Sequence, residues 1–297
     1  MKRIFLYITA ILAFAFSTRA ADGDLFPYPK PSDDMTGLTE RCDFLVSKFW
    51  NHCDFKGAMS KMDKFNNTFG DWVSFMPYAS ADTVHSAINR VIKQVEKSGP
   101  QTLALARMAQ NWSHCDTAQF YSDEVFLPFA KAAANHKKVP AEDRKYFATQ
   151  VQIMENTQVG QPVGNLDYVT LDGQKGSLND IHTQMIVLFF NENDCSDCDM
   201  SRIHLSADIN ATALIKAGIL TVLCITPGEA TPEWKAEAAG YPKEWIIGAS
   251  NSADQYFSMR EKPSIYLMDS RHKLLVKDAN IHGLINTLTL LRQNAGI

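Results

Sequence analysis

The stretch MIVLFFNENDCSDCDMS (residues 185–201) sets the fold class of the second half of the chain. Its first six residues are a continuous apolar run, which is typical of a strand buried on both faces. Cys195 and Cys198 follow within a run of acids, and from Met200 onward apolar residues recur at helical spacing. With a second apolar run at 219–226, the stretch predicts a β-α-β unit whose helix begins at the cysteine pair.

The flanking sequence predicts the rest of an α/β domain. Upstream, two short extended runs flank Leu171-Asp172-Gly173, and Asp-Gly is a typical hairpin turn. Downstream, after a mixed insert at 227–262, residues 263–278 predict an antiparallel hairpin that turns at 269–272, and residues 282–292 predict a final helix. We interpret Cys224, in the middle of the second parallel strand, as a core residue.

The first half of the chain, from Asp34 to Asn156, shows helical spacing and hardly any strand alternation. In residues 80–100, one apolar stripe runs along a helix that Ser80 or Asp82 can cap and that Gly99-Pro100 ends. The many aromatic residues recur at the same spacing, so we assign them to core packing rather than to a ligand groove. Six segments predict short helices that form a small bundle, namely 37–50, 61–76, 80–100, 102–112, 124–136 and 141–154.

These patterns predict three parts: a signal peptide at 1–20, a helical domain at 21–157 and an α/β domain at 158–297. Lys2 and Arg3 precede an apolar stretch too short to span a bilayer comfortably, and small residues lead to Ala20. We therefore expect cleavage after Ala20, with an uncleaved anchor as the alternative. The mature chain is expected to be periplasmic or secreted, without a membrane span, in a compartment where disulfides persist.

Composition describes an ordinary globular protein. Of the 297 residues, 45% are hydrophobic and 21% are charged, the net charge is −4 and the pI is about 6.1. This balance gives no electrostatic basis for binding nucleic acid.

Three further cysteines lie in the helical domain. If Cys42 and Cys53 shared one straight helix, about 16 Å would separate them, which is beyond disulfide reach. A bridge in this domain would then join Cys115 to one of them, and three free thiols are the alternative.

The order of elements from residue 158 to residue 297 resembles the thioredoxin fold, and the sequence is similar to periplasmic thiol-disulfide oxidoreductases of the TlpA kind. The segments that carry the resemblance are GQPVGNLDYVTLDGQKGSLNDI, the CxxC pair and EKPSIYLMDSRHKLLVKD. The resemblance implies that Pro263 is a cis-proline beside the CxxC and that the backbone of Lys262 meets the substrate. The helices upstream look like a domain of unknown function found ahead of such domains in Gram-negative periplasmic proteins.

The position of the CxxC suggests its chemistry. A cysteine at a helix N-terminus has a lowered pKa, so Cys195 is expected to be the nucleophile and Cys198 the resolving thiol. Asp194 and Ser196-Asp197 replace the tryptophan and the Gly-Pro of the family pattern. Phe189 stands where thioredoxins place a buried acid, so no general base is identifiable.

Negative charge surrounds this helix start. Four acidic residues near Cys195 oppose its thiolate and so destabilise the reduced form. A destabilised reduced form lowers the redox potential, so we expect a reductase rather than an oxidant. The four acids are Glu192, Asp194, Asp197 and Asp199.

Two other interpretations use the same residues. In one, the disulfide is structural and takes no part in a reaction, and the fold serves as a binding module. In the other, Cys195, Cys198 and His204 hold a metal, although a structural zinc site requires four ligands and no further pair has recognisable spacing. We expect no metal and no cofactor. The partners of a reductase would be protein thiols or disulfides and an unidentified electron-donor protein.

Overall fold

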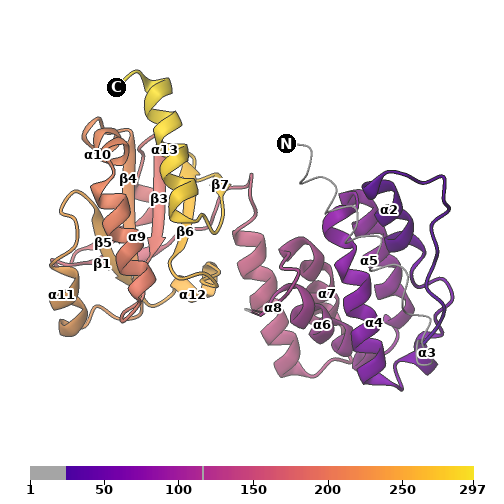
Figure 1. The fold of residues 1–297 in the computed structure, drawn as a ribbon. Coiled ribbons are helices and arrows are strands. Elements are labelled where there is room, and N and C mark those ends of the chain that lie inside the picture. Colours follow the sequence, from indigo (N-terminus) through magenta and orange to yellow (C-terminus); the bar gives the residue numbers. More distant parts are fainter. Residues whose placement is uncertain (1–24, 116) are drawn as a thin grey trace. The chain divides into compact units, whose positions relative to one another are not determined.

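The computed structural model describes residues 25–115 and 117–297, and the chain divides into two compact units at Ala148/Thr149 (Figure 1). We call the first the helical unit and the second the α/β unit. The predicted signal peptide lies outside the described residues. Within the described part of the chain, no helix combines the length and the apolar character needed to cross a bilayer.

All six helices that the spacing predicts in the first half of the chain are present. An additional short helix, α3 (Phe55–Ala58), and a 3₁₀ turn (Met76–Tyr78) connect them. The last helix, α8, begins in the helical unit and ends in the α/β unit. The predicted helices are α2 (Leu38–Lys48), α4 (Met62–Ser74), α5 (Ala81–Val95), α6 (Gly99–Ser113), α7 (Asp123–Asn135) and α8 (Ala141–Asn156).

The aromatic residues of this unit form its core, as their spacing indicates. Phe65, Phe69 and Trp72 are fully buried. The indole Nε1 of Trp72 donates to the backbone oxygen of Val46 at 3.1 Å, so the one polar atom of this ring is satisfied inside the core.

One helix boundary was wrong. Gly99-Pro100 does not end the helix of residues 80–100; α5 ends at Val95, and Gly99 and Pro100 form the first turn of α6. Ser98 caps α6 by accepting from Gln101 N. The physical reason is that proline fits the first turn of a helix, where its missing N–H needs no partner.

The α/β unit is built on one seven-stranded sheet in the order β2-β1-β5-β4-β3-β6-β7. Strands β3, β4 and β5 are parallel, β6 is antiparallel to β3, and the hairpins β1-β2 and β6-β7 lie at the two sides. The strands are β1 (Asp167–Thr170), β2 (Lys175–Ser177), β3 (Met185–Phe190), β4 (Leu220–Pro227), β5 (Ile246–Ser250), β6 (Ser264–Asp269) and β7 (Leu274–Val276).

Both faces of this sheet are covered, which explains the uninterrupted apolar run of β3. All six residues of β3 are buried. Helices α9 (Ser196–Ala207), α10 (Ile209–Lys216) and α13 (Ile281–Ala295) lie over one face (Figure 1), where side chains from all three join one core cluster. Phe257, directly after α12 (Ala253–Tyr256), packs on the other face.

Two features of this unit depart from the sequence-based expectation. The helix after the cysteines is two helices, because Asp208 ends α9 and caps α10 by accepting from Asn210 N and Ala211 N. The mixed insert contains α11 (Pro232–Ala238) and a full strand, β5, which pairs with both β4 and β1.

Candidate functional site

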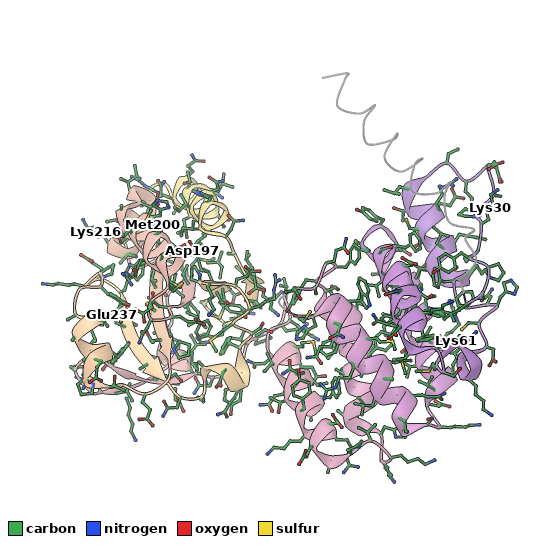
Figure 2. All side chains as sticks on the ribbon, turned by 60° about the horizontal axis from the view of Figure 1, so that its bottom comes forward. Lys30, Lys61, Asp197, Met200, Lys216 and Glu237 are labelled. Atoms are coloured by element: carbon green, nitrogen blue, oxygen red, sulfur yellow. A yellow bond between two sulfur atoms is a disulfide. The ribbon has the colours of Figure 1, made fainter. Side chains whose placement is uncertain are left out.

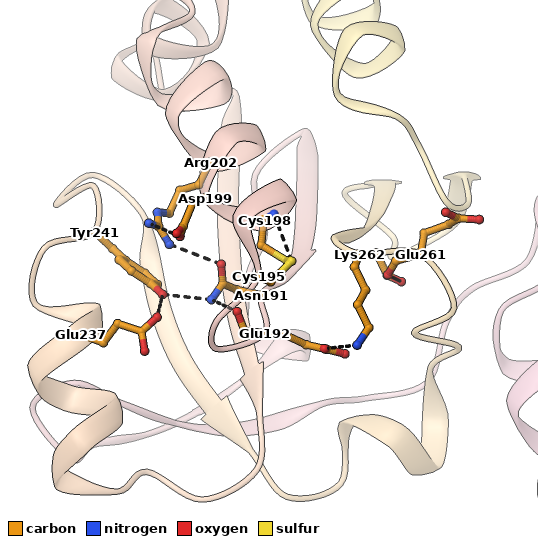
Figure 3. Close-up of a disulfide and its surroundings, with 11 residues drawn as sticks. Asn191, Glu192, Cys195, Cys198, Asp199, Arg202, Glu237, Tyr241, Glu261 and Lys262 are labelled. Atoms are coloured by element: carbon orange, nitrogen blue, oxygen red, sulfur yellow. Dashed lines mark hydrogen bonds and ion pairs between the residues drawn. A yellow bond between two sulfur atoms is a disulfide. The ribbon is translucent and has the colours of Figure 1, made fainter. Parts of the chain in front are cut away.

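Cys195 and Cys198 form a disulfide at the start of α9 (Figure 3). Their Cα atoms are 5.2 Å apart, and Cys195 is the N-cap, whose Sγ accepts from Cys198 N at 3.1 Å. The two sulfurs differ in access, because Cys195 is half-buried whereas Cys198 is 0% exposed. An incoming reactant therefore meets Cys195 first.

The register of the sheet brings Pro263 to the same end of β3. Phe190, the last residue of β3, pairs with Ser264, the first residue of β6. The residue before Ser264 is Pro263, and the Lys262–Pro263 peptide bond is cis, as the resemblance implies. The roles of Cys195, Cys198 and Pro263 in a reaction remain predictions.

An ion pair connects the two segments that flank the disulfide. Lys262 Nζ lies 2.5 Å from Glu192 Oε2 (Figure 3). A second pair lies on α9, where Arg202 Nη2 is 2.7 Å from Asp199 Oδ1. Two of the four acids near the cysteines, Glu192 and Asp199, are thus paired with a basic side chain. The other two, Asp194 and Asp197, are exposed. The negative field at the disulfide is therefore weaker than the sequence alone indicates.

A buried polar network lies at the carboxyl end of β3. Asn191, 0% exposed, donates from Nδ2 to the Tyr241 hydroxyl at 2.9 Å and to Glu192 O at 3.2 Å. Tyr241 in turn donates to Glu237 Oε1 at 2.9 Å. Arg202 Nη1 donates to Asn191 Oδ1 at 3.3 Å, and its guanidinium carbon lies 3.7 Å from the centre of the Tyr241 ring (Figure 3).

Two groups near this network keep their protons well into alkaline pH. Burial raises the pKa of the Cys224 thiol to about 12. Burial, together with the hydrogen bond to Glu237, raises the pKa of Tyr241. Cys224 lies in the core cluster of the α/β unit, as predicted.

Other candidates from the sequence do not gather at the disulfide. Phe189 is fully buried in the core, and the ring of His204 packs near that of His282, with centroids 6.0 Å apart. Within the described residues, no cluster of three or more His, Cys, Asp or Glu side chains is suited to a metal. Cys42, Cys53 and Cys115 are free thiols, so the structure has no bridge among them.

Sequence reasoning missed Asn191, Arg202 and Tyr241. Arg202 carried a signal, because it is the first basic residue after the CxxC and stands four positions after Cys198, on the same helical face. Tyr241 lies in the mixed insert at 227–262, where the local sequence gives no sign of this contact.

Comparisons with known proteins agree with this two-part organisation. Residues 15–157 match the family described as "Domain of unknown function (DUF5106)". No curated protein matches the chain. The solved structure of a thioredoxin-like protein from Bacteroides caccae ATCC 43185 is 21% identical, with a TM-score of 0.73 over 89% of this chain and 98% of that one.

Two further solved structures are similar to about half of this chain. A conserved protein of unknown function from Bacteroides fragilis is 30% identical over 44% of this chain and 98% of its own, with a TM-score of 0.42. The thioredoxin domain of a thiol-disulfide oxidoreductase from Bacteroides vulgatus is 20% identical over 45% of this chain and 97% of its own, with a TM-score of 0.39.

Proposed function

We propose that this chain, a thioredoxin-like α/β unit preceded by a DUF5106 domain, is a thiol-disulfide oxidoreductase that acts as a reductase. One observation carries the proposal. At the carboxyl end of a central strand of a thioredoxin-like sheet, a disulfide presents the half-buried Cys195 and hides the fully buried Cys198. This asymmetry is what a nucleophile and a resolving thiol require.

In the reducing direction, the Cys195 thiol gives its proton to water, and the resulting thiolate attacks one sulfur of a substrate disulfide. The bond from Cys195 to that sulfur forms, the substrate disulfide breaks, and its other sulfur leaves as a thiolate that takes a proton from water. Cys198 then gives its proton to water and attacks Cys195 Sγ. The Cys195–Cys198 bond forms, the mixed disulfide breaks, and the second substrate sulfur leaves as a thiolate that also takes a proton from water. The substrate gains two electrons and two protons, and the protein's dithiol loses them.

A second dithiol must return the protein to its reduced state. The donor is proposed to be a protein dithiol, which exchanges by the same steps in reverse. The reducing direction of the reaction is inferred from charge. Asp194 and Asp197 lie within two residues of Cys195, are exposed, and oppose its thiolate. The opposition is modest because exposed charges are screened by water.

The location is proposed to be the periplasm or another secreted space. The proposal is supported by the Lys2-Arg3 start, the short apolar run and the similarity to periplasmic proteins of the TlpA kind. An oxidising space also supplies substrates for a disulfide reductase.

The alternative function is a binding module with an inert disulfide. Reduction of insulin disulfides by the dithiothreitol-treated protein distinguishes the two. We expect turnover in wild type and its loss in Cys195→Ser, with Cys115→Ser as the matched control that keeps it. A wild-type protein without insulin reduction would support the binding module.

A further inference from the structure

Helix α9 exposes two apolar side chains and partly buries a basic one. Met200 and Ile203 are 52% and 53% exposed, whereas the side chain of Arg202 between them is 15% exposed. Met200 lies on the outer side of α9 together with Asp197 (Figure 2). A surface helix ordinarily buries its apolar residues and exposes its charges, because an arginine taken out of water must be paired or hydrogen-bonded. The burial of Arg202 therefore calls for a specific role.

The inner side of the Arg202 guanidinium meets neutral groups. It donates to the Asn191 carboxamide and stacks on Tyr241, whose raised pKa keeps the phenol neutral. Its carboxylate partner, Asp199, is 54% exposed and lies on the solvent side. Water screens an exposed carboxylate, so Asp199 offsets the guanidinium charge mainly on its solvent side.

Cys198 lies one helical turn before Arg202 on α9. Cys198 and Arg202 are four residues apart on α9, a spacing that places their side chains on the same face one turn apart. Cys198 is fully buried and Arg202 is partly buried, and Asn191, which accepts a hydrogen bond from Arg202, precedes the CxxC by four residues (Figure 3).

We propose that Arg202 is a positioning residue of the disulfide site, whose partly buried guanidinium stabilises negative charge on Cys198 Sγ while the disulfide is open. The proposal rests on the proposed thiol-disulfide function. In the step concerned, the Cys198 thiol gives its proton to water, its thiolate forms the bond to Cys195 Sγ, and the substrate sulfur leaves as a thiolate. Arg202 transfers neither electron nor proton; it lowers the free energy of the attacking thiolate.

The other ionisable groups around Cys198 are less suited to this role. Asp197 and Asp199 on its own helix and Glu192 in the preceding loop are anionic. Lys262, which precedes β6, is paired with Glu192, and its side chain is 58% exposed. Cys224 in β4 stays neutral, because burial raises its pKa to about 12. Glu237 is an acid that accepts from Tyr241, and His204 and His282 are exposed, so none of the three offers a buried positive charge.

The test is a pH titration of Cys198 thiolate absorbance in the full chain carrying Cys195→Ser. Adding Arg202→Met is expected to raise the midpoint by about one pH unit, a tenfold loss of thiolate below the midpoint. Arg202→Lys, which keeps the charge, should recover most of this loss. Arg271→Met, which removes an exposed charge from the β6-β7 turn, should leave the midpoint unchanged.

Two further variants separate charge from packing. Arg202→Gln keeps a donor for Asn191 without the charge, and it replaces Arg202→Met if that variant fails to fold. Tyr241→Phe keeps the charge but loses the hydrogen bonds to Asn191 and Glu237, so it should titrate like its parent. Equal shifts in Arg202→Gln and Tyr241→Phe, or no shift in a folded Arg202 variant, would overturn the proposal. Insulin reduction is read separately, so failure of the enzyme function is distinguishable from failure of this role.

Discussion

Asn156, the last residue of α8, is hydrogen-bonded to Tyr256 across a sequence separation of 100 residues. Its Nδ2 donates to Tyr256 O at 2.6 Å, and its Oδ1 accepts from Gly164 N at 2.5 Å. A methyl group at position 164 would overlap the Asn156 carboxamide. The end of α8 is therefore part of the α/β unit, although its periodicity continues the helical pattern.

The first prediction concerns this connection. Asn156→Ala removes the partners of the partly buried Gly164 N–H and of the Tyr256 carbonyl oxygen, and is expected to cost about 1–3 kcal/mol of unfolding free energy. A fragment of residues 158–297 should be less stable than one of residues 149–297 by a similar or larger amount. Urea denaturation followed by circular dichroism measures both, with exposed Gln158→Ala as the control. Equal stability of the two fragments would place the boundary at 157/158, as the sequence predicts.

The second prediction separates the two cysteines. Cys195→Ser should abolish disulfide exchange, whereas Cys198→Ser should accumulate mixed disulfides, because the buried thiol that releases the substrate is gone. Pro263→Ala should prolong such adducts or broaden their range. Non-reducing electrophoresis after expression in an oxidising compartment shows adducts as reductant-sensitive bands. Absence of any such band from Cys198→Ser would contradict the assignment of roles.

The third prediction concerns the redox potential. We expect a value nearer to the thioredoxin end of the known range, about −270 mV, than to the oxidant end, about −120 mV. Asp197→Asn should raise the redox potential, because the exposed carboxylate opposes the thiolate. Glu244→Gln, in the loop between α11 and β5, should leave the potential unchanged. Equilibration with glutathione buffers provides the measurement. A wild-type value above about −180 mV would refute the charge argument.

The fourth prediction concerns the pair formed by Glu192 and Lys262. Because both side chains are substantially exposed, at 36% and 58%, their coupling should contribute less than about 1 kcal/mol to stability. A double-mutant cycle with Glu192→Gln and Lys262→Met measures it, and the coupling should disappear in 1 M salt, where the Debye length is about 3 Å. A coupling above about 2 kcal/mol that persists in salt would show a desolvated pair.

The fifth prediction is a loss of stability at high pH. Burial raises the pKa of Cys224 from its ordinary value near 9 to about 12 in the folded chain. Between these values the unfolded chain has lost the proton and the folded chain has kept it, so unfolding free energy falls as pH rises. Cys224→Val should reduce this slope by up to about 1.4 kcal/mol per pH unit. Ile225→Val, a core change in the same strand without a titrating group, should keep the wild-type slope.

Local patterns predicted most of the fold. The thioredoxin-like order was confirmed, since the run of β3, the Asp-Gly hairpin and the hairpin after Pro263 are each encoded within a few consecutive residues. Strand β5 was missed because its apolar run is short and follows a segment rich in turn residues.

The candidate site divides in the same way. The cysteine pair is contiguous, so its disulfide and helix position could be predicted. The network of Asn191, Arg202 and Tyr241 could not, because these residues come from the end of β3, from α9 and from the segment after α11, and only the packed fold brings them together. The ion pair of Lys262 likewise depends on sheet register rather than on local sequence.

The short span of the disulfide has a consequence for the whole chain. Cys195 and Cys198 are three residues apart, so the bond closes a tiny ring and tethers no distant segments. Chain-entropy arguments assign such a ring about 2 kcal/mol, against about 4.7 kcal/mol for a loop of a hundred residues. The two core clusters of the sheet therefore have to maintain the architecture by themselves. Opening the disulfide is therefore expected to leave the scaffold folded.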